Sequence, residues 1–234
     1  AGGSYTDAAG HVQAFVASQV NGSWQPAQQI PGLAALNSGG QATVVSVSCA
    51  TPGTCSAGGS YTGSSNRQQA FIADEVNGTW GNAQQVPGTP SLGNQAAITS
   101  LSCARAGTCA AGGSVSSGGG FVVSKSGGTW GHAQPVPGLD SLGGGYVTAV
   151  SCASAGYCAA VGDNDAGEGT RVFVADEIHG TWHDAIQITG TPPLFTNEDS
   201  GVSAVSCASA GNCAAGGTSE TDQSGYQAFA VSRH

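Results

Sequence analysis

The sequence predicts an all-β fold, a β-propeller of about five four-stranded blades built from repeats of about 50 to 56 residues. The first observation is a repeated unit. Val-Ser-Cys-Ala-Thr-Pro-Gly-Thr-Cys-Ser-Ala-Gly-Gly at 47–59 recurs at 101–113, 150–162 and 205–217, and its first cysteines are 54, 49 and 55 residues apart. The second observation is that apolar residues alternate with polar ones along each repeat, whereas no segment has helical periodicity.

Each repeat contains four predicted strands. Residues 41–49 alternate small polar with β-branched side chains, a pattern typical of a strand buried between two faces. Residues 55–62 and 69–76 are the second and third strands, and the Asn-Gly pair at 77–78 predicts a tight hairpin into a fourth strand, residues 79–86. The pair of third and fourth strands recurs around Phe15 and Trp24, Phe121 and Trp130, and Phe173 and Trp182.

The two ends of the chain hold incomplete repeats. The chain starts in a second strand at Ala1 and finishes in a third strand that begins near Phe229. We therefore expect one propeller domain over residues 1–234, whose first blade lacks its first strand and whose last blade lacks its fourth. These ends must close against each other or against another chain, which leaves a homo-oligomer open. A solenoid is the alternative, but its repeats are usually shorter.

The motif Ser-Cys-Ala-x-x-Gly-x-Cys-x-Ala-Gly-Gly, followed by Ser-Lys-Ser-Gly-Gly-Thr-Trp at 124–130, resembles the blades of secreted bacterial propeller repeat proteins. It is more distantly similar to photosystem II assembly-factor propellers and to sialidase Asp-box repeats. Asn21, Asn77, Gly127 and His179 stand where an Asp box has its aspartate, so the box is degenerate. The resemblance implies the propeller fold and does not imply sialidase activity.

Charge and cysteine content restrict the partners and the compartment. With a net charge of −9 and five basic residues, the chain has no electrostatic footprint for nucleic acid, and no apolar run is long enough for membrane insertion. The chain begins at Ala1 and has no methionine, so we expect a mature, secreted, extracellular protein whose leader has been removed. The equal spacing in every copy predicts four disulfides in an oxidising compartment, joining Cys49 to Cys55, Cys103 to Cys109, Cys152 to Cys158 and Cys207 to Cys213.

The predicted inner strands argue against catalysis. Propeller glycosidases need two carboxylates facing a sugar, and residues 41–49, 95–103, 146–152 and 201–207 contain no Asp or Glu. The arginines are scattered through different blade positions, and no Ser-His-Asp set can be nominated. We therefore name no catalytic residue and expect a protein that is not an enzyme, with glycoside hydrolase as the least favoured alternative.

The variable loops predict where a ligand would bind. The turns after the first and third strands scarcely vary, while the loops between the second and third strands, and those between blades, differ from copy to copy. A rigid frame tends to display its binding residues on such loops. The loop residues Asp163, Asp165 and Glu168 have the oxygen density of a calcium site without the complete loop pattern, so no cofactor is required and calcium remains open.

Polar and aromatic residues near this variable face predict a shallow carbohydrate-binding site. The candidates are Tyr5, Gln13, Tyr61, Gln69, Tyr146, Tyr226 and Gln227. We therefore expect a non-catalytic lectin with several weak, similar sites that bind glycans through avidity. The alternative is a protein-interaction or assembly scaffold that docks a secreted protein partner on one asymmetric patch. The repeated tryptophans fit packing between blades better than sugar stacking.

Overall fold

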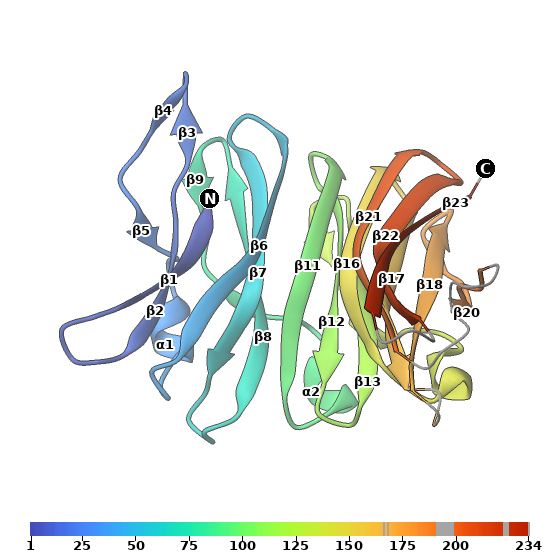
Figure 1. Ribbon diagram of the computed structural model, residues 1–234. Helices are drawn as coiled ribbons and strands as arrows, with labels where there is room; N and C mark the ends of the chain where they lie inside the picture. The colour runs from blue at the N-terminus through green and yellow to red at the C-terminus, as the bar shows by residue number, and fades with distance from the viewer. Residues whose placement is uncertain (166, 168, 191–198, 222–224, 234) are drawn as a thin grey trace.

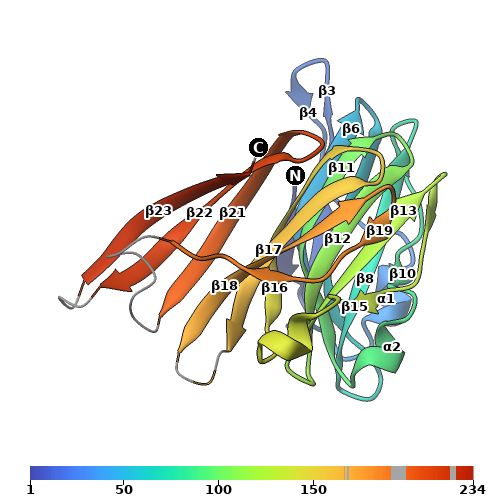
Figure 2. The same ribbon diagram turned by 90° about the vertical axis from the view of Figure 1, so that its right-hand side faces the viewer.

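The computed structural model describes residues 1–165, 167, 169–190, 199–221 and 225–233. They form five antiparallel sheets of three to five strands in chain order, from the N-terminal sheet in blue to the C-terminal sheet in red, and one further sheet of two strands near the N-terminus (Figure 1). In the view turned by 90°, the C-terminal sheet in red stands apart beside the fourth sheet, and the first three sheets overlap one another (Figure 2). Each of the five larger sheets is one blade, so the predicted all-β propeller fold of repeated blades is confirmed.

The strands occupy equivalent positions in the five blades. The first blade holds β1 (Gly2–Thr6), β2 (Val12–Val16), β3 (Gln19–Val20), β4 (Ser23–Trp24) and β5 (Gln28–Gln29). The second holds β6 (Ala42–Thr51), β7 (Thr54–Thr62), β8 (Gln68–Val76), β9 (Thr79–Trp80) and β10 (Gln84–Gln85). The third holds β11 (Ala96–Arg105), β12 (Thr108–Val115), β13 (Gly119–Ser126), β14 (Thr129–Trp130) and β15 (Gln134–Pro135).

The last two blades follow the same order. The fourth holds β16 (Tyr146–Ser154), β17 (Tyr157–Asp165), β18 (Thr170–Ile178), β19 (Thr181–Trp182) and β20 (Ile186–Gln187). The fifth holds β21 (Ser200–Ser209), β22 (Asn212–Thr221) and β23 (Gly225–Arg233). The first blade thus starts with a second strand, as the sequence predicts.

Two predictions about the outer part of the blade are wrong. The fourth strand is not continuous over 79–86, because its middle leaves the sheet: the Ala83 N–H donates to the Pro31 carbonyl of the preceding blade at 2.7 Å. The chain also contains short helices where none was expected. Single turns at α1 (Leu33–Leu36), α2 (Thr89–Leu92) and η1 (Leu139–Leu142) lead from one blade to the next. A single turn is too short to show helical periodicity in a sequence.

All four predicted disulfides form. Each joins directly opposite residues of the first two strands, as Cys103 and Cys109 do, and so pins one hairpin. The hairpin turn in turn contacts the turn between the third and fourth strands, since the Gly78 N–H donates to the Gly53 carbonyl at 2.9 Å. The two uniform turns therefore lie together on one side of each of the three complete blades, and the variable loops lie on the other.

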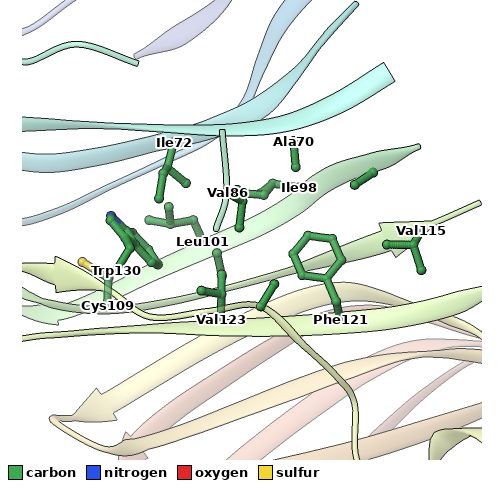
Figure 3. Close-up of a cluster of buried hydrophobic side chains, with 13 residues drawn as sticks. Ala70, Ile72, Val86, Ile98, Leu101, Cys109, Val115, Phe121, Val123 and Trp130 are labelled. Atoms are coloured by element: carbon green, nitrogen blue, oxygen red, sulfur yellow. The ribbon is translucent and has the colours of Figure 1, made fainter. Parts of the chain in front are cut away.

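The core is divided into clusters between neighbouring sheets. Figure 3 shows the cluster between the second and third blades, where Ile72 of β8 faces Leu101 of β11 and Trp130 of β14. Phe71, Phe121 and Phe173, one from each complete blade, are fully buried. Each of these clusters needs the adjacent blade for burial, which is why the repeat spacing in the sequence predicts a stack of sheets.

Polar links join each blade to the next beside the tryptophans. Ser18 donates to Glu75 Oε1 at 2.6 Å, and Ser124 donates to Glu177 Oε1 at 2.5 Å. The link between the second and third blades is a salt bridge instead, from Lys125 Nζ to Asp74 Oδ1 at 2.7 Å. The repeat thus carries two alternative polar pairs at one structural position.

Glu177 predicts a pH-dependent stability at this position. Burial raises the pKa of Glu177, and the hydrogen bond from Ser124 opposes that rise only in part. The Glu177 carboxyl therefore holds its proton more tightly in the folded chain than in the unfolded chain. As the pH rises above the ordinary pKa of 4.5, ionisation of this carboxyl lowers the free energy of unfolding. We expect Glu177→Gln to raise Tm at pH 7, with a gain that shrinks towards pH 4.5. Thermal unfolding from pH 4 to 8 measures it.

The exposed carboxyl of Asp184 provides the control for this prediction. Asp184→Asn removes the same charge without touching a buried group, so its effect on Tm should change little with pH. A Glu177→Gln variant whose Tm difference from the parent stays constant over the pH range would contradict the prediction.

Candidate functional site

A groove of about 470 Å³ lies between the third and fourth blades on the side of the variable loops. Its wall includes Tyr146, Asp163, Asn164 and Asp165. Glycines line much of the remainder, at positions 118, 119, 143, 145 and 169. Because glycines have no side chains, they leave the groove open beside the polar wall. The groove brings together one predicted sugar-binding residue, Tyr146, and two predicted calcium ligands, Asp163 and Asp165.

Tyr146 stands at the start of β16 and presents its ring to solvent. The residue is 45% exposed, although its neighbour Val147 is fully buried. This alternation follows from the strand, whose successive side chains point to opposite faces. Its hydroxyl donates to Asp163 Oδ2 at 3.1 Å, which fixes the ring. Burial, followed by the nearby Asp163 carboxylate, raises the pKa of Tyr146, so the phenol stays protonated at neutral pH.

Asp163 is a buried carboxyl that ties the fourth blade to the fifth. It is 8% exposed, and its Oδ1 accepts the Val202 N–H of β21 at 2.8 Å. Burial raises the pKa of Asp163, while the hydrogen bonds from Val202 and Tyr146 act in the opposite direction. Both carboxylate oxygens already accept hydrogen bonds, so the chief role visible for Asp163 is to hold Tyr146 in place.

Asn164 was not among the predicted site residues. It is 1% exposed, and its Nδ2 donates to the Leu142 carbonyl at 2.7 Å. Its Oδ1 is buried and has no hydrogen-bond partner among the described residues. An unsatisfied buried acceptor costs about 1–3 kcal/mol. Asn164 also lines the groove, although its Oδ1 itself is closed to solvent.

The register explains why Asn164 was missed. It occupies the strand position held by Tyr61 in the second blade, because Asp163 pairs with Val172 as Ser60 pairs with Ala70. At that position the sequence predicts only the aromatic residues Tyr5 and Tyr61 as site residues. Only the buried amide oxygen without a donor identifies Asn164, and this is a property of the folded chain.

The structure places the calcium candidates only in part. The Asp165 carboxylate accepts the Gly167 N–H at 2.9 Å, while Glu168 lies outside the described residues. Among the residues that the structure describes, no group of three or more His, Cys, Asp or Glu side chains is arranged to hold a metal ion. Calcium binding at Asp163, Asp165 and Glu168 stays a prediction.

The other predicted sugar-binding residues lie in different blades. In the first blade, Tyr5 is 41% exposed and its hydroxyl accepts Gln29 Nε2 at 2.6 Å, while Gln13 donates to Asp7 at 3.0 Å. In the second blade, Tyr61 is only 5% exposed and packs beside Phe71.

Gln69 stands directly opposite Tyr61, where it accepts a hydrogen bond from Gln85 at 2.7 Å. In the fifth blade, Tyr226 is 68% exposed, next to the exposed Gln227. The structure therefore does not gather the seven candidates into one site. Tyr146 is the candidate that lines the groove described above.

A larger hollow of about 740 Å³ lies between the same two blades on the side of the disulfides. Several of its polar groups bond to one another or to the preceding blade. Lys125 pairs with Asp74, Glu177 accepts Ser124, and the Tyr157 hydroxyl lies 2.9 Å from His179 Nδ1. These groups have their own partners, so this hollow has less to offer a ligand than the groove at Tyr146.

Comparisons with known proteins yield solved structures but no family. No family model matches the sequence, and no curated protein matches it. A neuraminidase-like protein of A/flat-faced bat/Peru/033/2010 is similar at 14% identity with a TM-score of 0.47, over 93% of this chain and 60% of that one. Neuraminidase-like proteins of A/little yellow-shouldered bat/Guatemala/060/2010 and A/bat/Guatemala/164/2009 follow at 14% identity and a TM-score of 0.42. They match 78% and 79% of this chain.

The chain spans about 53–60% of the length of these structures. A likeness at this level of identity carries no information on function, and the propeller architecture rests on the sheets and their register. The resemblance to secreted bacterial repeat proteins stays a prediction. Two coarser properties are clear: four disulfides indicate an oxidising compartment, and no helix among the described residues is long and apolar enough to cross a membrane.

Proposed function

We propose that the groove at Tyr146 binds carbohydrate and that the protein is a secreted, non-catalytic lectin. One observation carries the proposal. An open groove of about 470 Å³ is lined by an aromatic residue that is 45% exposed, Tyr146, and by the polar residues Asp163, Asn164 and Asp165. A sugar offers both complements, because its C–H face stacks on an aromatic ring and its hydroxyls donate hydrogen bonds.

The charges of the groove favour a neutral sugar over an acidic one. Asp163 and Asp165 line it together with Tyr146, and none of its lining residues is basic. An anionic sugar would need a cation, usually arginine, to compensate for its carboxylate. The chain as a whole is also acidic, with a net charge of −9. Neutral hexoses or their oligomers therefore fit this groove better than sialic or uronic acids.

The groove supports binding without hydrolysis. A glycosidase needs one carboxyl that is free to donate a proton and a second that attacks the sugar or activates water. Asp163 accepts hydrogen bonds on both oxygens, and Asp165 accepts the N–H of its own loop. Neither is positioned as a free acid facing the other across a sugar.

The equivalent grooves differ in their lining, which argues for one principal site instead of several similar ones. Between the second and third blades, the hollow on this side has about 150 Å³ and is lined by Gln68, Gln95, Ala96, Ala97, Ser114, Val115 and Ser116. Ala97 stands there at the strand position of Tyr146, since it pairs with Ser114 as Tyr146 pairs with Asp163. The aromatic platform is thus specific to the fourth blade.

A glycan array with the disulfide-intact protein, with and without calcium, tests the proposal, and titration calorimetry then measures the affinity for a sugar that binds. We expect Tyr146→Ala to weaken binding about tenfold, the equivalent of about 1.4 kcal/mol, because the stacking platform is removed. Tyr146→Phe keeps the ring and should retain most of the affinity.

Tyr5→Ala provides the matched control, since it removes an exposed tyrosine from the first blade and leaves this groove intact. The carbohydrate proposal fails if no glycan class binds. The assignment to the groove fails if a glycan binds equally well to the parent and to Tyr146→Ala while Tyr5→Ala weakens it.

A further inference from the structure

The first blade begins with its second strand, β1, and the place of the first strand is open. β1 pairs with β2 on one side, whereas the equivalent β7 pairs with both β6 and β8. Four of the five residues of β1 are exposed, while seven of the nine in β7 are buried. An unpaired edge of this kind is a template for a further strand.

Gly3 shows that the sequence of β1 is fitted to such a strand. The equivalent glycines Gly59, Gly113, Gly162 and Gly217 each lie against a carbonyl of their own first strand, so that an added methyl group would overlap that oxygen. For Gly59 the carbonyl is that of Thr43. At Gly3 a methyl group would meet only the Phe15 ring, at 3.1 Å. Position 3 is therefore a glycine, as a first strand beside β1 would require, although the described residues place no first strand there.

The close approach depends on an irregularity shared by the first strands. In β6, β11, β16 and β21 the register shifts at the same place, between Val44 and Ser46 in β6 and between Ile98 and Ser100 in β11. A β-bulge of this kind bends the strand locally. All four first strands that set a carbonyl against their glycine carry this bulge, so we expect the edge of β1 to favour a bulged strand.

Serine hydroxyls are the second feature, besides the bulge, that we expect in a strand bound beside β1. Ser46 and Ser48 of β6 accept the backbone N–H groups of Leu101 and Cys103 in the next first strand, at 3.0 and 2.9 Å. Ser100 and Ser102 accept from Val150 and Cys152 in the same way, both at 3.0 Å. Two serines thus join β6 to β11 and β11 to β16, and one serine, Ser151, joins β16 to β21 by accepting the Cys207 N–H at 3.0 Å.

Val47 and Cys49 hold in β6 the positions that Leu101 and Cys103 hold in β11. Their N–H groups consequently face the open place beside β1, where a preceding first strand with two serines would accept them. Trp24 of the first blade also differs from its equivalents in the other blades. It is 60% exposed, whereas Trp80, Trp130 and Trp182 are 5–6% exposed and donate to a residue of the preceding blade.

We propose that the open edge of β1 is a binding site for one extended segment of the first-strand type, supplied from outside residues 1–234. This segment carries alternating apolar residues, a bulge whose carbonyl lies against Gly3, and two serines spaced two residues apart. The serine hydroxyls accept the N–H groups of Val47 and Cys49. A second copy of residues 1–234 fits less well, because its first strands β6, β11, β16 and β21 are already paired within their own blades.

The first test extends the chain before Ala1 with a first strand, in the same register as in the other repeats. The sequence of residues 41–56, placed directly before Ala1, reproduces the order Cys55-Ser56-Ala57 and positions a first strand beside β1. We expect the extension to raise Tm by several degrees and to slow hydrogen exchange of the β1 amides that do not face β2. Gly3→Ala should abolish both gains in the extended protein and change the Tm of the unextended protein much less.

The control extension has the same composition and the same cysteine positions, but its residues 41–48 stand in a scrambled order that separates the two serines. It should leave Tm and the β1 amides unchanged, because it lacks the bulge and the serine spacing. An extension carrying Ser46→Ala and Ser48→Ala should keep only part of the gain. The proposal is overturned if the ordered and scrambled extensions behave alike, or if Gly3→Ala leaves the gain intact.

A synthetic peptide with the sequence of residues 41–51 and Cys49→Ser tests the same edge without the covalent link. Protection of the β1 amides at millimolar peptide, lost in Gly3→Ala, supports the proposal. Sedimentation of the unextended protein addresses the second copy. Self-association that protects β1, and that neither the extension nor the peptide suppresses, would assign the edge to a second copy and overturn the proposal.

Discussion

Gly113→Ala is expected to lower the free energy of unfolding by about 3 kcal/mol, the upper range for a group added to a packed interior. The added methyl group would overlap the Ala97 carbonyl of β11 and lie 2.9 Å from Phe121 Cε1. Both neighbours are fixed, since the carbonyl belongs to the backbone and Phe121 is fully buried. Thermal and denaturant unfolding with the disulfides intact measure this loss, which corresponds to about 10 °C in Tm for a domain of this size.

Gly119→Ala is the matched control in the same blade. A methyl group there would make only ordinary contacts, at 3.5 Å from the Val115 side chain and 3.7 Å from Ser117 Oγ. Its effect should therefore stay within about 0.5 kcal/mol. If Gly113→Ala unfolds at the same temperature as Gly119→Ala, the close approach of the two strands is not what requires glycine at this position.

The repeat made the fold predictable. The spacing of the cysteines fixed which residues pair, and the Asn-Gly turn at 77–78 marked where the third strand ends, so the strand boundaries were predicted to within about two residues. Local sequence cannot show that Ala83 leaves the sheet, because its partner Pro31 belongs to another blade. The single helical turns were missed for a related reason: four residues such as Leu33–Leu36 are too few to display a period.

The candidate site was less predictable, because its properties depend on burial. Tyr5 and Tyr61 have the same sequence context, Gly-Gly-Ser-Tyr-Thr, yet Tyr5 is 41% exposed and Tyr61 is 5% exposed. The difference arises because β7 is covered on both sides by strands, while the first blade has an open edge. In the same way, only the folded chain shows that the Asn164 amide oxygen lacks a donor.

The alternation of polar pairs between blades predicts that one pair can replace the other. Lys125, 7% exposed, pairs with Asp74 and lies 5.7 Å from the Trp130 ring. The neighbouring links place a serine and a glutamate at the same two positions, as in Ser124 with Glu177. Lys125→Glu alone would set a second carboxylate beside Asp74, and Asp74→Ser alone would leave the lysine without its anion. Each should cost about 3 kcal/mol.

The double variant Asp74→Ser with Lys125→Glu rebuilds the serine–glutamate pair of the adjacent blades. We expect it to be about 2–3 kcal/mol more stable than Lys125→Glu alone, although it carries two changes. The serine hydroxyl can donate to the new carboxylate and accept the Trp130 N–H, as Ser124 accepts the Trp182 N–H at 2.9 Å. Arg105→Glu, the same charge reversal at an exposed residue, should change stability by about 0.5 kcal/mol or less.

A double-mutant cycle in denaturant measures the coupling between the two positions. Full additivity, in which the double variant loses the sum of both single losses, would show that the two pairs are not interchangeable at this site. If the double variant recovers the lost stability, either a serine–glutamate pair or a lysine–aspartate pair can join two blades at this position. The blades could then diverge one at a time, because every change at one position requires only a single compensating change across the interface.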